Sequence, residues 1–416
     1  MYRLIAVAAL SICCLKVDAA SILIPMDDAQ RNHLKAYGLV YWVLKREGTV
    51  EWLLNYRGGS FIMEYSREIE SECIIRGIST EVLAAAAVNA VLSEVNQPNN
   101  NMNLVRLERA ARIAVYSPKN ELIQDETDAV IAVLDYAEIP YRIIYDEEIL
   151  HDSLSRFEWV HLHHEDFTGQ HGRFLRRESA VTQMKLQEIT ASQFGYPKVS
   201  AMKLDVAKRI KSYCAGGGYL FAMCSGAETL DIALAANGVD ISESVYDGDD
   251  ADPEAQGKLD YDQSLAFENF TLEYSGRKYS DINSGPHRPN YWETPNTYFR
   301  LFNYSAKWDI IPTMLTQNHE QVIREFHGQT SVFNKYLVKP QVLILGENSV
   351  DNRVRYIYNE LGKGHWTFYS GHDPESTGGG GPNRRTDLNL FPHSPGYRLI
   401  LNNVLFPSAR KKKQKT

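Results

Sequence analysis

The chain has 416 residues, of which 44% are hydrophobic and 23% are charged, and this composition excludes a disordered or fibrous protein. Its formal net charge of −8 predicts no basic surface for nucleic acid, and the basic stretch 409–416 is expected to be a short solvated tail. The length is sufficient for two domains, or for one domain with long insertions.

The first twenty residues have the pattern of a secretory signal peptide. Arg3 supplies a positive charge, residues 4–15 are apolar, and Val17-Asp18-Ala19 is a small-residue cleavage site. We therefore expect a mature chain that begins near Ser21 and is exported to the periplasm or the medium without a lipid anchor. No later stretch is apolar for long enough to predict a transmembrane segment.

Three cysteines follow the predicted signal peptide: Cys73, Cys214 and Cys224. An odd number leaves at least one thiol outside any disulfide within the chain. A bridge between Cys73 and Cys214 is one possible pairing.

An N-terminal α/β segment is predicted over residues 21–104. Its elements are expected to be a strand at 21–25, a helix at 33–45, a second strand at 50–56 and an alanine-rich helix at 81–95. Strand, helix and strand in succession are typical of a parallel sheet. The polar stretch 97–101, which contains a proline, marks the predicted boundary to the next domain.

The second domain is predicted over residues 105–408. Its expected strands and helices alternate, which predicts a doubly wound, mostly parallel α/β sheet of flavodoxin-like type. Two stretches without this alternation, 166–199 and 239–333, are predicted to be insertions that roof the site. The expected elements are strands at 112–116, 141–145, 159–163, 218–223, 342–345, 356–358 and 365–369, and helices at 127–137, 201–213 and 397–405.

A nucleophile turn is predicted at Cys224. An apolar strand runs into this cysteine, with Ala222 two residues before it and Gly226 two residues after it, and such small residues permit a tight strand-to-helix turn. The helix N-terminus would stabilise a thiolate, the backbone of Ser225 and Gly226 would supply oxyanion donors, and Glu228 would contact substrate. The alternative is a small buried cysteine packed beneath a helix.

A base for this cysteine is predicted at His372, which follows the strand at 365–369. Asp373 or Glu375 would orient the imidazole, in the arrangement of nucleophile, base and orienting carboxylate. The alternative is a histidine that caps a turn.

A second constellation is the run His161–Asp166. His161 and His163 share one face of a strand, and His164, Glu165 and Asp166 follow at its carboxyl end, where ligands of doubly wound sheets bind. We interpret His163, His164, Glu165 and Asp166 as substrate contacts, with no obligatory metal or cofactor. A divalent metal is the alternative, with Asp247, Asp249 or Asp250 as oxygen ligands, and a hydrogen-bonded polar loop is another.

These motifs resemble a known superfamily. The elbow at Cys224, the late Gly371-His372 pair and the final helix are similar to class I glutamine amidotransferase-like domains over Arg112 to Phe406, and Gly362–Asp373 resembles the trehalose-utilisation-type branch. The resemblance implies the roles of Cys224 and His372 as nucleophile and base. The triad glutamate of that family stands two residues after the histidine, where this chain has Pro374, and Glu375 follows.

A second resemblance concerns the N-terminal segment. Leu23–Gln30 and Leu54–Phe61 are similar to exported Bacteroidetes-type proteins labelled asparagine synthetase B. An ATP-dependent synthetase of that name carries a catalytic cysteine after Met1 and a Ser-Gly-Gly-x-Asp-Ser loop. This sequence has neither, so we do not expect ATP-coupled synthesis.

Three functions follow as open alternatives. The first is a cysteine-dependent amidase or hydrolase that uses Cys224. The second is a non-catalytic module that binds a carbohydrate or another small ligand through the crevice at the carboxyl edge of the sheet, His163, Glu165 and the aromatic stretch 246–308. The third is a metal-dependent hydrolase centred on His161–Asp166. The expected ligand is a small molecule, a peptide or a carbohydrate, and the sequence leaves the substrate and the oligomeric state open.

Overall fold

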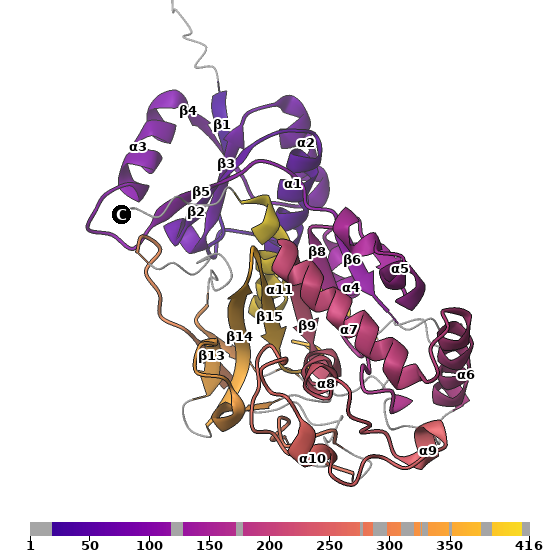
Figure 1. Cartoon of the computed structure of the whole chain (residues 1–416). Coiled ribbons are helices and arrows are strands. Elements are labelled where there is room, and N and C mark those ends of the chain that lie inside the picture. Colours follow the sequence, from indigo (N-terminus) through magenta and orange to yellow (C-terminus); the bar gives the residue numbers. More distant parts are fainter. Residues whose placement is uncertain are drawn as a thin grey trace, which may run out of the picture.

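The computed structural model describes residues 19–117, 128–171, 178–274, 278–285, 298–308, 320–324, 326, 332–348, 352–375 and 385–409. The predicted signal peptide up to residue 18 and the basic tail from residue 410 lie outside these ranges. The described chain forms a five-stranded sheet and a ten-stranded sheet, with the last helix near their junction (Figure 1).

The N-terminal sheet is antiparallel throughout. Its order is β4-β1-β3-β2-β5, so the β2–β3 hairpin places β3 between β1 and β2. The first two strands do run in the same direction, but they are not neighbours, and the predicted parallel sheet is therefore wrong for this segment. The strands are β1 (Ala19–Ile24), β2 (Val50–Leu54), β3 (Ser60–Glu64), β4 (Glu81–Ala84) and β5 (Asn103–Leu107).

The two faces of this sheet pack against different helices. Ile22, Trp52 and Phe61 face α1 (His33–Lys45), whereas Leu23, Leu53 and Ile62 lie in a smaller apolar cluster with Val95 of α3 (Ala85–Val95). The helix predicted over 81–95 begins only at Ala85, because Glu81–Ala84 extend the edge of the sheet beside β1. Strand β5 continues this sheet beyond residue 104, to Leu107.

The large sheet has a parallel half and an antiparallel half. Its order is β11-β10-β13-β14-β15-β9-β8-β6-β7, and β12 pairs with β14. The strands from β15 to β7 are parallel neighbours, and the strands from β11 to β15 are antiparallel neighbours. The strands are β6 (Ile113–Tyr116), β7 (Arg142–Ile144), β8 (Trp159–Leu162), β9 (Tyr219–Met223), β10 (Tyr298–Leu301), β11 (Val322–Arg324), β12 (Phe333–Asn334), β13 (Leu343–Asn348), β14 (Arg353–Leu361) and β15 (Gly364–Tyr369).

The mixed α/β class is thus as predicted, and both stretches predicted as insertions contain regular elements. The stretch 239–333 contributes β10 and β11 to the edge of the large sheet, and 166–199 contains α6. These short strands lie among polar residues, so neither alternation nor length distinguished them in the sequence. The remaining helices are α2 (Arg67–Arg76), α4 (Ala129–Tyr136), α5 (Asp146–Leu150), α6 (Glu178–Gln193), α7 (Val199–Gly216), α8 (Cys224–Ala235), α9 (Ser244–Asp247), α10 (Ala255–Lys258) and α11 (Pro395–Leu405).

Helices cover both faces of the parallel strands. Alternating residues of β9 divide between two cores: Phe221 and Met223 join the core of α1, α4 and α11, and Leu220 and Ala222 join the core of α7 and α8. We call these the α4 face and the α7 face. Because consecutive residues of a strand point to opposite faces, consecutive residues at its end can serve different sites.

Helix α11 joins the two sheets. Arg398 is fully buried, and its Nε donates to the Tyr37 hydroxyl of α1 over 2.8 Å, while its other nitrogens donate to the carbonyls of Met26 and Gly58. The Tyr37 hydroxyl in turn donates to Asn402 over 2.5 Å. The N-terminal unit and the large sheet therefore share one buried interface.

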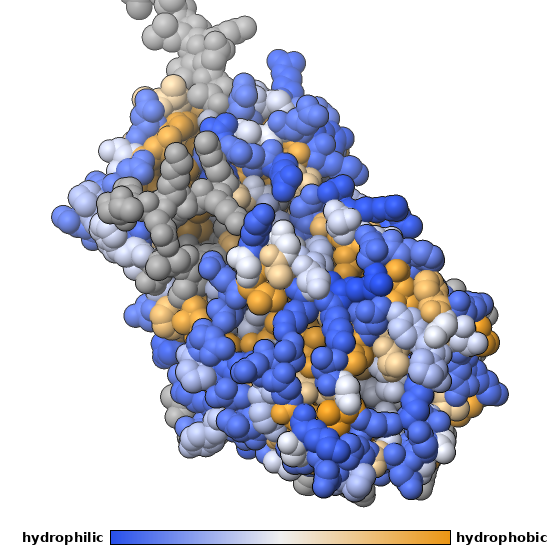
Figure 2. Space-filling model, in the orientation of Figure 1, coloured by the Kyte–Doolittle hydropathy of each residue, from blue (hydrophilic) through white to orange (hydrophobic). Residues whose placement is uncertain are grey.

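Two further sequence expectations can be compared with the structure. Cys73 of α2 and Cys214 of α7 are both buried, and they form no disulfide with each other. Within the described residues, no helix combines the length and the apolar character needed to cross a membrane. The face of the molecule in Figure 2 is mostly hydrophilic, with apolar patches of limited size.

Candidate functional site

Several predicted site residues meet at the carboxyl edge of the parallel strands. His163 directly follows β8, Cys224 follows β9, and His372 follows β15. Strand β9 pairs with both β8 and β15, so Cys224 lies between the strand ends that precede the two histidines. The strand after β6 in the chain, β7, lies on one side of it, and the following strand, β8, lies on the other side. Ligands of open α/β sheets bind at the crevice beside such a change of direction.

Three imidazoles form the centre of this edge. Nε2 of His163 lies 2.6 Å from Nδ1 of His372, and the His163 and His164 rings stack with their centroids 3.9 Å apart. One ring nitrogen from each of His163, His164 and His372 lies within 4.8 Å of the other two. His163 is buried, whereas His164 and His372 are partly exposed, so a ligand can reach the cluster from solvent.

Asp128 holds the buried histidine of this cluster. One carboxylate oxygen caps α4 by accepting from the backbone N–H groups of Val130 and Ile131. The other lies 3.2 Å from Nδ1 of His163 and 3.3 Å from Nε2 of His161. Burial raises the pKa of Asp128, but the two imidazoles outweigh it and hold the pKa well below its ordinary value.

His161 has a structural position beneath the cluster. Its side chain is fully buried, its Nδ1 lies 3.0 Å from the carbonyl of Phe221, and its ring stacks on Trp159. Both its ring nitrogens thus face protein atoms. It serves as a partner of Asp128 and not as a residue open to a ligand.

Cys224 is strained and inaccessible. Its φ of 50° is in the left-handed region, which a residue with a side chain seldom adopts, and this is the conformation of a sharp strand-to-helix elbow. Its exposure is 0%, and it belongs to the apolar cluster that includes Phe221, Met223 and Tyr369. It is not a member of the group of close ligand atoms around His163.

The elbow is tied directly to β8. The N–H of Gly226 donates to the carbonyl of His163 over 2.7 Å, and a Cβ at Gly226 would come within 2.7 Å of the same oxygen. Only glycine permits this approach. The N–H of Gly226 therefore binds the strand, which contradicts its predicted role as an oxyanion donor, and Ser225 next to it is buried.

Asp373 and Glu375 do not take the predicted orienting role. Asp373 accepts from the Tyr397 hydroxyl and from Thr386, and Glu375 accepts from Ser394, the residue that caps α11. The backbone after His372 turns these carboxylates toward α11. The carboxylate that orients an imidazole of the cluster is Asp128, the residue that caps α4.

The acidic end of the run His161–Asp166 belongs to the α7 face. Glu165 lies 3.6 Å from the fully buried ammonium of Lys203, which also bonds to Asp146 over 2.9 Å. Burial lowers the pKa of Lys203, but the carboxylates of Asp146 and Glu165 outweigh it and raise the pKa above its ordinary value. Asp166 accepts from the Tyr279 hydroxyl over 2.8 Å.

Helix α8 anchors the segment that follows it. Glu228, a predicted substrate contact, accepts from Ser280 over 2.8 Å and is buried. Asp231 accepts from the backbone N–H groups of Leu265, Ala266 and Phe267. Both acidic side chains therefore hold the chain between 264 and 280 against the elbow helix.

The acidic residues after α8 are not ligands of the histidine cluster. Asp240, Asp247 and Asp249 surround the ammonium of Lys198, with distances of 2.7 Å to Asp240 and 3.3 Å to Asp247. Asp250 is exposed. Of the oxygen ligands predicted from this stretch, Asp247 and Asp249 are thus bound to a lysine.

Two residues of the site were missed in the sequence. Asp128 stands immediately before the apolar run of α4, which is the pattern of a helix cap, so the signal was present. Lys203 had no such signal, because its burial depends on contacts with Asp146 and Glu165, which are distant in the chain.

No protein-family model matches the chain, and no curated protein matches it in sequence. Similar solved structures include two cytoplasmic proteins of Salmonella typhimurium, 12% and 11% identical, each matched over 100% of its length and 72% of this chain, with TM-scores of 0.37 and 0.35. Another is a GH42 beta-galactosidase from G. stearothermophilus, which is 12% identical. The match covers 64% of this chain and 28% of the beta-galactosidase chain, with a TM-score of 0.27. Scores of this size carry no argument about function.

Proposed function

We propose that the chain is a metal-dependent hydrolase whose metal is held by His163, His164 and His372. The observation that carries this proposal is the convergence of three imidazole nitrogens within 4.8 Å of one another at the carboxyl edge of the sheet. Three imidazoles are a recurrent ligand set for catalytic zinc, and a fourth position then remains for substrate.

The surroundings of His163 also fit a metal ligand. A metal-bound histidine commonly donates its second N–H to a carboxylate, and Asp128 lies 3.2 Å from Nδ1 of His163 while Nε2 faces His372. The partly exposed rings of His164 and His372 would give substrate access to the ion. Zinc would act there as a Lewis acid that polarises a carbonyl or phosphoryl group.

We also propose that the fold is that of a class I glutamine amidotransferase-like domain. In chain order the parallel strands are arranged second, first, third, fourth and fifth, which is the flavodoxin-like doubly wound order, and the elbow follows the fourth strand. This arrangement supports the resemblance. The antiparallel strands β10, β11, β13 and β14 extend that core at one edge.

A cysteine hydrolase is the second candidate. The strained φ of Cys224 favours it, because nucleophile elbows store backbone strain of this kind. The full burial of Cys224 among apolar residues opposes it, because a nucleophile has to be reached by its substrate. The two candidates therefore differ in which substitution should abolish turnover.

An activity screen of the mature chain separates these candidates. The protein is stripped with a chelator, reloaded with zinc, and assayed on amide, ester and glycoside chromogenic substrates. The variants are His372→Ala, Cys224→Ala and, as a matched control, His151→Ala, an exposed histidine whose Nδ1 lies 2.8 Å from the carbonyl of Glu147. We expect zinc-dependent turnover that is lost only in His372→Ala.

The opposite pattern would support the cysteine route. Turnover that survives the chelator and disappears in Cys224→Ala would refute the metal proposal. Export, inferred from residues 1–20 alone, has a separate test: the N-terminus of the protein recovered from the periplasm or medium should lie near Ser21.

A further inference from the structure

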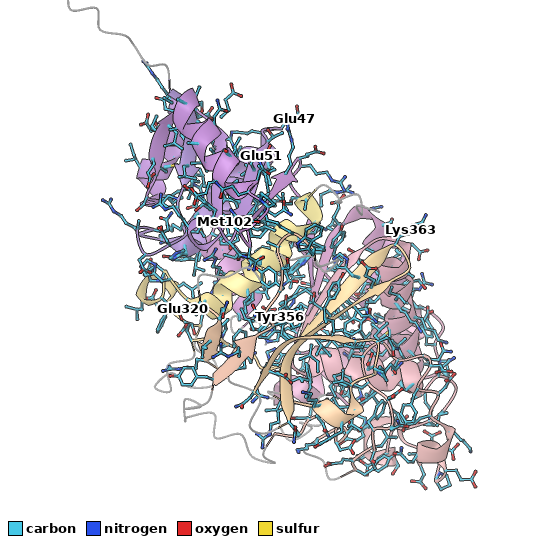
Figure 3. The ribbon with its side chains drawn as sticks, turned by 90° about the vertical axis from the view of Figure 1, so that its left-hand side faces the viewer. Glu47, Glu51, Met102, Glu320, Tyr356 and Lys363 are labelled. Carbon is cyan, nitrogen blue, oxygen red and sulfur yellow. The ribbon has the colours of Figure 1, made fainter. Side chains whose placement is uncertain are left out.

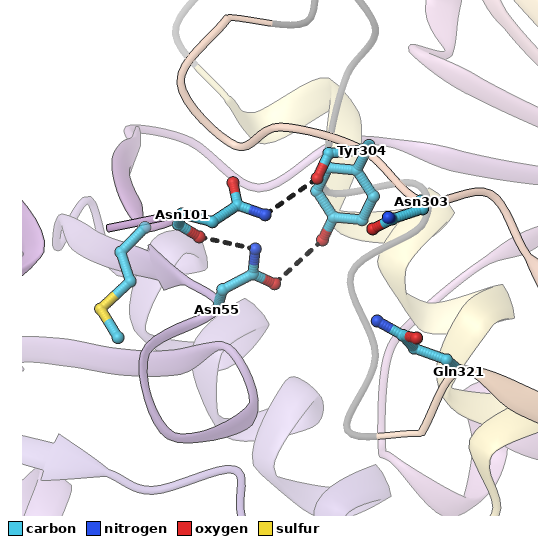
Figure 4. Close-up of a pocket in the computed structure, with 6 residues that line it drawn as sticks. Asn55, Asn101, Asn303, Tyr304 and Gln321 are labelled. Atoms are coloured by element: carbon cyan, nitrogen blue, oxygen red, sulfur yellow. Dashed lines mark hydrogen bonds between the residues drawn. The ribbon is translucent and has the colours of Figure 1, made fainter. Parts of the chain in front are cut away.

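A concave site lies at the junction of the two sheets, away from the histidines. It is a cavity of about 300 Å³, at the lower end of the range for small-molecule sites. Met102 lies at this junction on the side of the N-terminal unit, and Glu320 lies on the side of the large sheet (Figure 3). The cavity is lined by Asn55, Asn101, Met102, Asn303, Tyr304 and Gln321 (Figure 4).

One side of the cavity is held together by hydrogen bonds. The amide of Asn55 donates to the carbonyl of Asn101 over 2.8 Å, and its oxygen lies 3.2 Å from the Tyr304 hydroxyl that donates to it. The amide of Asn101 donates to the carbonyl of Tyr304 over 2.9 Å. These bonds connect the N-terminal unit to the loop after β10 and fix the ring of Tyr304 at the cavity.

The other side presents amides that protein atoms do not occupy. Asn303 and Gln321 are exposed, and within the described residues their side-chain amides make no hydrogen bond to protein. The backbone of Gln321 is fixed at the sheet edge, since its carbonyl accepts from the N–H of Leu301 over 2.9 Å. Each amide offers two donors and one acceptor oxygen to a ligand.

The lining specifies the charge and polarity of that ligand. None of the six lining side chains is charged, so the cavity favours a neutral molecule. The amides offer donors and acceptors together, while Tyr304 and Met102 offer apolar surface. A sugar ring matches this combination, because it carries hydroxyl groups around its rim and C–H groups on its faces.

We propose that this cavity binds one ring of a neutral carbohydrate through Asn303, Gln321 and the ring of Tyr304. The site is separate from the histidine cluster, because β13 and β14 lie between β10 and β15 in the sheet. It therefore would position a glycan-bearing ligand on the protein independently of the reaction at the cluster. The proposal does not require the cluster to bind metal.

The test uses the full mature protein and saturation-transfer NMR with glucose, galactose, mannose and N-acetylglucosamine as probes. The test variant is Asn303→Ala combined with Gln321→Ala, which removes the two unoccupied amides without breaking a protein hydrogen bond. The matched control is Gln193→Ala, which removes an exposed amide at the end of α6. We expect ring-proton signals from at least one sugar, and an affinity at least tenfold lower in the double variant alone.

Three outcomes would overturn the proposal: no sugar signal, equal sugar binding by wild type and double variant, or binding only of an N-acetylasparagine amide probe. The last outcome would assign the cavity to peptide amides. The same measurement on metal-stripped His163→Ala tests the cavity independently of the histidine cluster. This variant should still bind the sugar, even if the cluster has no function.

Discussion

The six-residue run His161–Asp166 contributes side chains to both the α4 face and the α7 face, and the two faces have different roles. On the α4 face, His163 meets Asp128 and His372 and remains connected to solvent through its partly exposed neighbours. On the α7 face, Glu165 is enclosed with Lys203 and Asp146. Because β8 ends at Leu162, the chain after it is free of strand alternation, and His163 and Glu165 point to different partners although they are only two residues apart.

The comparison teaches that a dense polar run is not one site. The imidazoles converge with their ring nitrogens close together, which suits a cation. The carboxylates on the other face already have a cation in Lys203. Substitutions on the α7 face should therefore change stability, whereas substitutions on the α4 face should change ligand binding.

The largest expected effect comes from Lys203→Met. This change leaves the carboxylates of Asp146 and Glu165 buried without their ammonium partner, and breaking a buried ion network in this way costs about 3–5 kcal/mol. Chemical denaturation should show the loss in the free energy of unfolding. If Lys203→Met instead kept the stability of the wild type but lost zinc binding, the structural role assigned to the α7 face would be wrong.

The next effect is the pH dependence contributed by Asp231 of α8. Burial raises its pKa to about 6, against the opposing effect of three backbone N–H donors. The folded pKa exceeds the unfolded one, so this contribution to stability is present below about pH 4 and is lost as pH rises through 6, by roughly 3 kcal/mol.

Asp231→Asn tests that sign. The variant removes the titrating group, so its free energy of unfolding should change less between pH 4 and pH 7 than that of the wild type. Parallel pH profiles for the two proteins would show that Asp231 does not titrate in this range.

A smaller effect is expected from Asp128→Asn on the α4 face. Asparagine still caps α4, but it no longer provides the carboxylate beside His163, so we expect zinc affinity to fall roughly 10–100-fold, which is about 1.4–2.7 kcal/mol. A competition titration with a zinc chelator measures the change. Unchanged affinity would mean that Asp128 does not support a metal ligand.

The sequence predicted the parallel half of the fold well. The strands around Ile113, Val160 and Phe221 have continuous apolar runs, and the elbow at Cys224 is marked by its small neighbours. The antiparallel strands β10 and β11 were missed because they have only four and three residues. The pairing of β1 with β3 was missed because strand partners depend on tertiary contacts and not on local pattern.

The candidate site was predicted in part. His163, His164 and His372 were named from the sequence, and the structure brings them together. Their orienting carboxylate was sought in Asp373 and Glu375, next to His372 in sequence, whereas Asp128 caps α4 and is distant from His372 in the chain. Which side chains meet at a sheet edge depends on strand order, and strand order is not encoded in any single segment.

The most direct test of the central claim is zinc K-edge absorption spectroscopy of the zinc-loaded mature protein. We predict one zinc per chain, with three imidazole nitrogens at about 2.0–2.1 Å and no sulfur ligand. The His163→Ala variant should lose this signal while keeping its circular dichroism spectrum. A sulfur shell at about 2.3 Å would assign the ion to a cysteine, and absence of stoichiometric zinc would contradict a metal centre at these histidines.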